Sequence, residues 1–152
     1  MRRRLRLPGY GICCLAAWLG LGCAAAQAQA VAGTLNGFGF FGSWAVQCGS
    51  PAPTNIIREV KWTGHEPVEF IESYAGATTG NHYRVLSAQM PNPTTLQIQV
   101  LLNGRIVENL TIAKYSTNWI RTMTNQTSQG FVVQNGVVAA SGQPTPWLQK
   151  CR

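Results

Sequence analysis

The chain has 152 residues, and only 11% of them carry a charge, against about 25% in an average soluble domain. All five acidic residues are Glu, so the sequence contains no Asp and every mechanism that requires one is excluded. The length predicts a single domain. The composition excludes an acidic disordered chain and a charged coiled coil.

The first 30 residues have the three parts of a secretory signal peptide. Four arginines open the chain, an apolar run rich in Leu, Ala and Gly follows over 11–26, and an Ala-x-Ala site ends at Ala30. The run is shorter than the roughly 20 residues that span a bilayer, which favours cleavage over a transmembrane anchor. We predict cleavage after Ala30, with lipoprotein processing at Cys23 as the alternative. The mature protein, residues 31–152, would be periplasmic or secreted.

Removal of residues 1–30 changes how the charge is interpreted. Four of the twelve Lys and Arg residues leave with the signal peptide, so the formal net charge falls from +7 to +3. The remaining cations are scattered along 31–152, whereas a nucleic-acid-binding patch normally clusters them. The sequence therefore predicts no nucleic-acid partner, and it predicts one domain over 31–152.

Two cysteines remain in the mature chain, Cys48 and Cys151. An even pair in an exported chain predicts a disulfide, with two free buried thiols as the alternative. The bond would close a loop of about one hundred residues and join the first strand to the C-terminus. A redox Cys-x-x-Cys motif or a zinc site cannot be built from two distant cysteines.

Short strands are predicted along most of the mature chain, after a flexible lead over 31–37. Apolar side chains alternate in five segments, at 56–62, 68–71, 83–86, 96–102 and 106–112. Asn103-Gly104 and Asn135-Gly136 are strong hairpin signals, because both residues of each pair can take a positive φ. About eight strands therefore predict an all-β fold, an antiparallel meander closed into a small barrel or folded as a sandwich, with its ends joined by Cys48–Cys151.

No catalytic constellation is found in the sequence. A Ser-His-Asp triad needs an Asp, and no nucleophile elbow, phosphate loop or dinucleotide fingerprint is present. Glu66, Glu69 and Glu72 are predicted to form a solvated strand edge rather than a glycosidase pair. His65 and His82 could bind a metal together with Glu66, but two histidines on separate segments are expected to be unrelated surface residues. We predict a protein that is not an enzyme and needs no metal or cofactor.

Cations on apolar strand faces are the remaining candidates for a site. Arg58 shares a face with Val60 and Trp62, and Arg121 shares one with Trp119. Such a cation most often packs its stem and extends its charge to water. The alternative is that it binds a polar ligand group inside a barrel mouth. The predicted ligand-binding residues are Arg58, Trp62, Trp119 and Arg121.

Gly-Ser-Trp at 42–44 is similar to the Gly-x-Trp motif of the calycin superfamily, which includes lipocalins, avidins and small periplasmic metalloprotease inhibitors. The resemblance implies a barrel in which Trp44 plugs one end and a late Arg packs across it. Arg121 is the best candidate for that Arg.

A second resemblance covers more of the chain. Gly-Ser-Trp-Ala-Val-Gln-Cys at 42–48, Asn55, Ile-Arg-Thr at 120–122 and Thr-Pro-Trp-Leu-Gln-Lys-Cys at 145–151 together resemble a family of small exported proteobacterial proteins of uncharacterised function. Both cysteines of the predicted disulfide fall inside its end motifs. The resemblance implies a periplasmic location and supplies no activity.

Two functions are consistent with these observations. The first is a non-enzymatic binding module of the bacterial envelope that holds a small or amphipathic ligand in the barrel mouth. The second is a protein-interaction module, such as an inhibitor of an exported hydrolase, that acts through a loop or through the N-terminal segment 31–41. That segment is Gly-rich and carries Phe38, Phe40 and Phe41, although these aromatics could instead form the first core strand.

Overall fold

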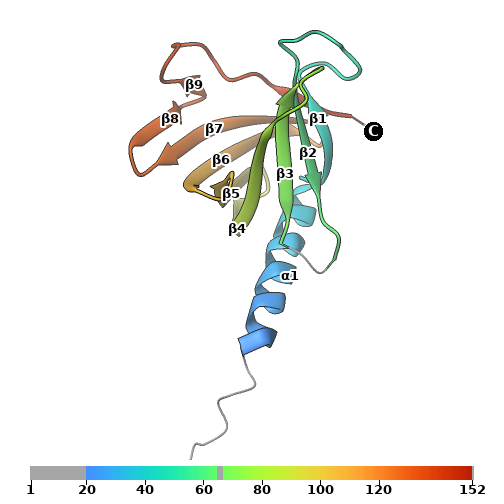
Figure 1. Ribbon diagram of the computed structural model, residues 1–152, viewed down its shortest axis with the longest axis vertical. Helices are drawn as coiled ribbons and strands as arrows, with labels where there is room; N and C mark the ends of the chain where they lie inside the picture. The colour runs from blue at the N-terminus through green and yellow to red at the C-terminus, as the bar shows by residue number, and fades with distance from the viewer. Residues whose placement is uncertain (1–19, 65–66, 152) are drawn as a thin grey trace, which may run out of the picture.

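The computed structural model describes residues 20–64 and 67–151, with side chains from residue 26 onward. It consists of ten strands preceded by one helix (Figure 1). In chain order the described elements are α1 (Gly20–Phe38), β1 (Gly42–Ala45), β2 (Ile56–Lys61), β3 (Glu69–Tyr74), β4 (Asn81–Asn92), β5 (Thr95–Leu102), β6 (Ile106–Ser116), β7 (Trp119–Thr127), β8 (Gly130–Gln134), β9 (Val137–Val138) and β10 (Leu148–Cys151).

Eight of these strands close into an antiparallel barrel. Each strand pairs with the next one along the chain from β1 to β7, and β10 pairs with both β1 and β7. Closure leaves no free edge on the ring, which removes a template for aggregation. The hairpin of β8 and β9 continues the sheet from β7 outside the ring. The predicted all-β meander is confirmed, and its form is the barrel rather than the sandwich.

Both Asn-Gly hairpins form where they were predicted. Asn103 has a φ of 49° and Gly104 a φ of 69° in the turn between β5 and β6. Asn135 and Gly136 take φ values of 53° and 73° between β8 and β9. Asn and Gly tolerate this left-handed region better than other residues, so the sequence specifies both turns locally.

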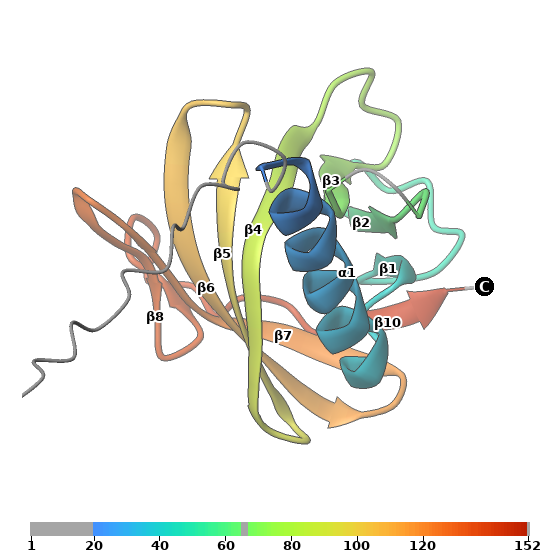
Figure 2. The same cartoon turned by 90° about the horizontal axis from the view of Figure 1, so that it is seen from below.

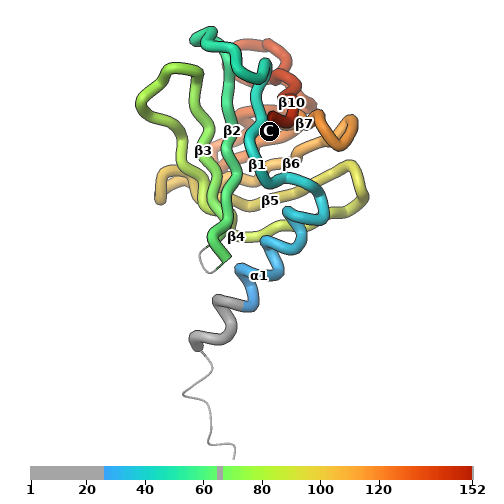
Figure 3. The backbone as a smooth tube through the Cα atoms, turned by 90° about the vertical axis from the view of Figure 1, so that its right-hand side faces the viewer, coloured from blue at the N-terminus to red at the C-terminus, as the bar shows by residue number. Residues whose placement is uncertain are grey.

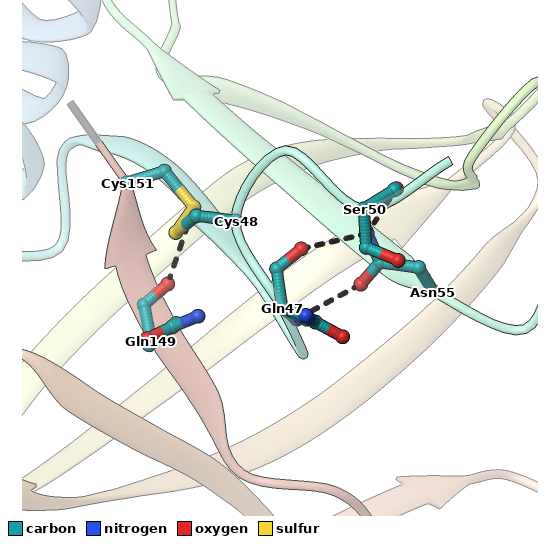
Figure 4. Close-up of a disulfide and its surroundings, with 6 residues drawn as sticks. All are labelled: Gln47, Cys48, Ser50, Asn55, Gln149 and Cys151. Carbon is teal, nitrogen blue, oxygen red and sulfur yellow. Dashed lines mark hydrogen bonds between the residues drawn. A yellow bond between two sulfur atoms is a disulfide. The ribbon is translucent and has the colours of Figure 1, made fainter. Parts of the chain in front are cut away.

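The predicted disulfide joins the end of the chain to the loop after β1. Cys48 and Cys151 are bonded across a Cα–Cα distance of 5.6 Å (Figure 4). Asn55, which is buried, fixes the loop that carries Cys48. Its Oδ1 accepts a hydrogen bond from Gln47 N at 3.0 Å, and its Nδ2 donates to the carbonyl oxygens of Gln47 and Ser50 at 2.9 Å each (Figure 4). Three of the hydrogen bonds that hold this loop therefore come from one amide side chain.

The segment before the barrel is a helix, not the predicted flexible lead. Val31, Leu35 and Phe38 lie at the i, i+4, i+7 spacing of one helix face, and none is more than 6% exposed. Figure 2, seen from below, shows α1 crossing the barrel end between β4 on one side and β1 and β10 on the other. Within the described residues, no helix combines the length and apolar character needed to cross a bilayer.

Two of the three aromatic residues of 31–41 are buried, and the third, Phe41, is half-buried. Phe38 is 2% exposed and Phe40 is 0% exposed, and both belong to the core. They form neither a free interaction segment nor a first core strand, since α1 runs through Phe38 and β1 begins only at Gly42. Phe38 and Phe40 are therefore not available on the surface as contacts for a partner.

Two lysines fix the C-terminal end of α1 against the barrel. Lys114 Nζ donates to the Phe38 carbonyl at 2.8 Å, and Lys150 Nζ donates to the Gly39 carbonyl at 3.0 Å. The last carbonyls of a helix lack partners within it and carry partial negative charge, so cations there are favourable. Figure 3 shows this end of α1 against the barrel and the other end directed away from it.

Leu35 tests whether α1 is part of the core. Its side chain is 0% exposed, so Leu35→Ala should lower the free energy of unfolding by about 2–3 kcal/mol, the low end of the usual range because a terminal helix can shift to fill the space. Urea unfolding monitored by circular dichroism measures this change. The control is Asn36→Ala, at an exposed position of the same helix, which should have little effect. Equal, small effects of the two substitutions would contradict the packing of α1.

The barrel interior changes character along its axis. At the end covered by α1 it is apolar and closely packed, with Phe40 edge-on to Phe70 at a centroid distance of 5.9 Å. Phe70 in turn stacks on Tyr83 at 4.4 Å. On the other side of Tyr83 the interior contains charged side chains and an open space.

Candidate functional site

A cavity of about 430 Å³ lies in the part of the barrel away from α1. Its lining comes from β2 to β10, and α1 contributes none of it. Tyr74 and Val132, which are 57% and 44% exposed, mark its opening to solvent. Most of the lining is apolar, including Ile56, Leu110 and Leu148. This volume lies in the range of small-molecule pockets, roughly 300–1,000 Å³.

Arg58 is the cation of this cavity, and its side chain is 6% exposed. Its Nε donates to Glu72 Oε2 at 3.0 Å, and its Nη2 donates to the same oxygen and to Thr122 Oγ1. The guanidinium lies 5.4 Å from the centroid of the Phe70 ring. Its Nη1 is buried and has no hydrogen-bond partner. The expectation that Arg58 extends its charge to water is therefore wrong, and its guanidinium faces the interior.

Glu108 and Asn125 face each other across β6 and β7 in the same cavity. Glu108 is 4% exposed, and its Oε2 accepts a hydrogen bond from Asn125 Nδ2 at 2.9 Å. Burial raises the pKa of the Glu108 carboxyl, the charge of Glu72 raises it further, and the Asn125 hydrogen bond opposes the rise. Asn125 Oδ1 is buried and has no partner. Two of the residues that line the cavity thus carry an unpaired donor and an unpaired acceptor.

Tyr83 forms part of the cavity wall where it meets the apolar core. Burial raises the pKa of its phenol, and the nearby charges of Glu72 and Glu108 raise it further. The phenol therefore stays neutral at physiological pH and keeps a proton to donate. Together these groups can form hydrogen bonds with the polar part of a ligand while the aliphatic walls contact its apolar part.

The raised pKa of Glu108 predicts how stability depends on pH. The folded state holds this proton more tightly than the unfolded state, so the Glu108 contribution to stability falls as pH rises from about 4.5 through the folded-state pKa. Glu108→Gln should therefore be more stable than the wild type at pH 7, by about 1 kcal/mol. The two proteins should differ less at pH 4.

Urea unfolding at the two pH values measures this difference. Glu59→Gln is the matched control, because Glu59 is an exposed acid of β2, outside the cavity. A Glu108→Gln protein that is less stable than the wild type at pH 7 would contradict the assigned burial of this charge.

The four predicted ligand-binding residues do not lie together. Arg58 lines the cavity, whereas Trp62 follows β2 at the α1 side of the barrel, beside a groove that includes Ala32 and Gly33. The Trp62 ring stacks on Phe41 at 6.4 Å. The shared strand face of Arg58 and Trp62 was visible in the sequence, but the two residues lie toward opposite ends of the barrel.

Trp119 and Arg121 lie on the outer side of the barrel wall, outside the cavity lining. Trp119 belongs to an exposed aromatic cluster with Tyr115 and Trp147. Arg121 Nε donates to Thr145 Oγ1 at 3.0 Å and its Nη2 donates to the Gly136 carbonyl at 2.7 Å. Arg121 thus joins the β8–β9 turn to the segment before β10, so its evident role is to support the cavity wall.

Trp44 is 1% exposed, and its Nε1 donates to the Phe40 carbonyl at 2.8 Å. The cation across its ring is Lys150, whose Nζ lies 5.1 Å from the ring centroid. Arg121, the residue expected there, lies instead over Trp147 at 5.8 Å. The expected pairing of Trp44 with Arg121 is replaced by one with Lys150.

Sequence reasoning missed most of the polar residues of the cavity, among them Glu72, Glu108 and Asn125. Glu72 was expected at a solvated edge, but the pairing of β2 with β3 places it opposite Arg58. Glu108 could have been found, because it alternates in phase with Leu110 on the apolar face of its strand. The signal was a charged residue at a position where the pattern required an apolar one.

The structure does not test the candidate metal site formed by His65, Glu66 and His82. His65 and Glu66 lie outside the described residues. His82 is exposed on β4, with its Nε2 3.3 Å from Glu69 Oε2. Among residues 26–64 and 67–151, no three His, Cys, Asp or Glu side chains lie close enough together to hold a metal.

No protein-family model, curated protein or solved structure matches this chain. The two resemblances noted in the sequence therefore remain predictions. Arguments about function rest on the cavity and on the residues that line it.

Proposed function

We propose that this protein is an exported, non-enzymatic binding module of the bacterial envelope that holds a small amphipathic ligand in the barrel cavity. The observation that carries the proposal is a pair of buried atoms without partners, Arg58 Nη1 and Asn125 Oδ1, in one cavity with apolar walls. Buried polar groups are hydrogen-bonded in most proteins. A molecule in this cavity would cover the apolar walls, and small rotations of the Arg58 and Asn125 side chains would bring both unpaired atoms within its reach.

Export is supported by the disulfide and by the burial pattern of α1. Disulfides persist mainly in oxidising compartments such as the periplasm. The described side chains of 26–30 are exposed or half-buried, and the first buried residue is Val31. Cleavage after Ala30 would therefore leave intact the helix face formed by Val31, Leu35 and Phe38.

Substitutions at two neighbouring valines of β9 test whether the cavity binds a ligand. Val138 is half-buried and lines the cavity, whereas Val137 is 39% exposed and does not. Val138→Trp should fill the opening of the cavity, and Val137→Trp adds the same ring outside it. The probe is N-phenyl-1-naphthylamine, an uncharged apolar dye whose fluorescence rises when it leaves water. Both variants are first compared with the wild type by urea unfolding, so that only folded proteins are tested.

The wild type and Val137→Trp should bind the dye in a saturable manner with similar affinity. Val138→Trp should bind it at least about tenfold more weakly, because an indole ring occupies the space. Equal binding by all three proteins, or no binding by the wild type, would overturn the proposal.

A further inference from the structure

The chemistry of the ligand can be inferred from the charges in the cavity, provided that the cavity does bind a ligand as proposed above. Arg58 is already paired with Glu72, so its charge is largely balanced. An anionic group entering the cavity would meet the negative charge of Glu72 and would have to lose its water beside Glu108. Charges are costly to bury without a partner of opposite sign. The cavity therefore disfavours an anion.

A cationic group is disfavoured for a different reason. It would lie beside the Arg58 guanidinium and could not accept a hydrogen bond from Nη1, because ammonium groups have no acceptor. Glu108 Oε2 already accepts from Asn125 Nδ2, so a cation could pair with this carboxyl only through Oε1, and that pairing would not satisfy Arg58 Nη1. A cation would leave the unpaired guanidinium N–H without a partner.

With anionic and cationic groups disfavoured, the two unpaired atoms indicate which uncharged group the cavity would bind. Arg58 Nη1 requires a hydrogen-bond acceptor, and Asn125 Oδ1 requires a donor. A carboxamide has both and carries no charge, and the apolar lining suits a hydrocarbon attached to it. We infer that the ligand is an uncharged, largely apolar molecule with an amide-like group, whose acceptor binds Arg58 and whose donor binds Asn125.

Three probes of equal chain length test this inference: octanamide, octanoate and octylammonium. They differ only in the head group, so isothermal titration calorimetry at pH 7 compares the head groups directly. Octanamide should bind the wild type at least about tenfold more tightly than either charged probe, since only the amide pairs both atoms without burying a charge.

Paired substitutions identify the residues responsible. Arg58→Met with Glu72→Leu removes the donor and its counter-ion together, so neither partner of the ion pair is left without the other. Glu69→Leu with Arg84→Met is the matched control, because these residues form an exposed pair on β3 and β4 at 3.8 Å, outside the cavity. Octanamide should bind the first double variant about tenfold more weakly and the second like the wild type. Asn125→Ala, which removes the Oδ1 acceptor together with the Nδ2 donor to Glu108, should also weaken binding.

The outcomes separate this inference from the proposed function. Octanoate or octylammonium binding as tightly as octanamide would overturn the inference about the head group and leave the binding function intact. Octanamide binding unchanged in the first double variant would also overturn it. Binding of the naphthylamine dye without any preference for octanamide overturns only the inference, whereas no binding of any probe overturns both.

Discussion

Replacing Cys48 and Cys151 together by alanine should lower the free energy of unfolding by about 4–5 kcal/mol. The bond joins residues separated by 103 positions, so it restricts the unfolded chain over nearly the whole domain. It also holds the short strand β10 beside β1, and β10 completes the barrel by pairing with β7 as well. Domains of this kind have only about 5–15 kcal/mol of stability in total, so the loss is a large fraction of it.

Urea unfolding with and without a reducing agent measures this loss. The oxidised wild type should be the most stable protein, and the reduced wild type should resemble the double variant. The reducing agent should have no effect on the stability of the double variant. This variant is therefore the control for any effect of the reducing agent other than breaking the Cys48–Cys151 bond. A double variant within about 1 kcal/mol of the oxidised wild type would contradict the assigned role of the bond.

Arg58→Met should destabilise the protein by about 3–4 kcal/mol. The substitution removes the guanidinium that binds Glu72 Oε2, and the Glu72 side chain, only 26% exposed, is left beside Glu108 without a cation. Methionine keeps an apolar contact with Phe70, so little of the loss comes from packing. The cost is that of a partly buried charge without its partner.

The double variant Arg58→Met/Glu72→Leu separates this effect from a simple loss of contacts. Removing both charges of a buried pair is often close to neutral for stability, so the second substitution should restore most of what the first one loses. Urea unfolding of the two single variants and the double variant gives the coupling between the residues. A double variant no more stable than Arg58→Met alone would show that the ion pair is not the cause.

The barrel could be predicted because its signals are local. Alternation of apolar residues marks most of the strands, and the two Asn-Gly pairs specify their turns by backbone conformation alone. The disulfide was predicted from the expected export of the chain and from an even number of cysteines. None of these signals depends on which strand pairs with which.

The helix α1 was missed because its pattern is short and rich in glycine. Val31, Leu35 and Phe38 do follow a helix face, but Gly33 and Gly37 lie between them and lower the intrinsic preference for a helix. Packing against the core stabilises the helix in spite of its composition. Contacts between a helix and distant strands cannot be predicted from the short stretch of sequence that forms the helix.

The cavity was predicted only in part. Strand alternation correctly placed Arg58 on an apolar face, but its partner Glu72 depends on the register between β2 and β3. The same limit applies to Trp119 and Arg121, since alternation tells which residues share a face but not whether that face lines the cavity. Polar residues of a barrel interior come from many strands, so they become recognisable as a site only after closure.

Occupancy of the cavity is tested most directly by native mass spectrometry of the protein purified from the envelope of the cells that produce it. The wild type should show the mass of residues 31–152 with one disulfide, plus a small uncharged molecule that is released on denaturation. The adduct should be retained by Val137→Trp and absent from Val138→Trp. A wild-type protein that carries no adduct, or an adduct that Val138→Trp retains equally, would contradict the proposal that the barrel holds a ligand.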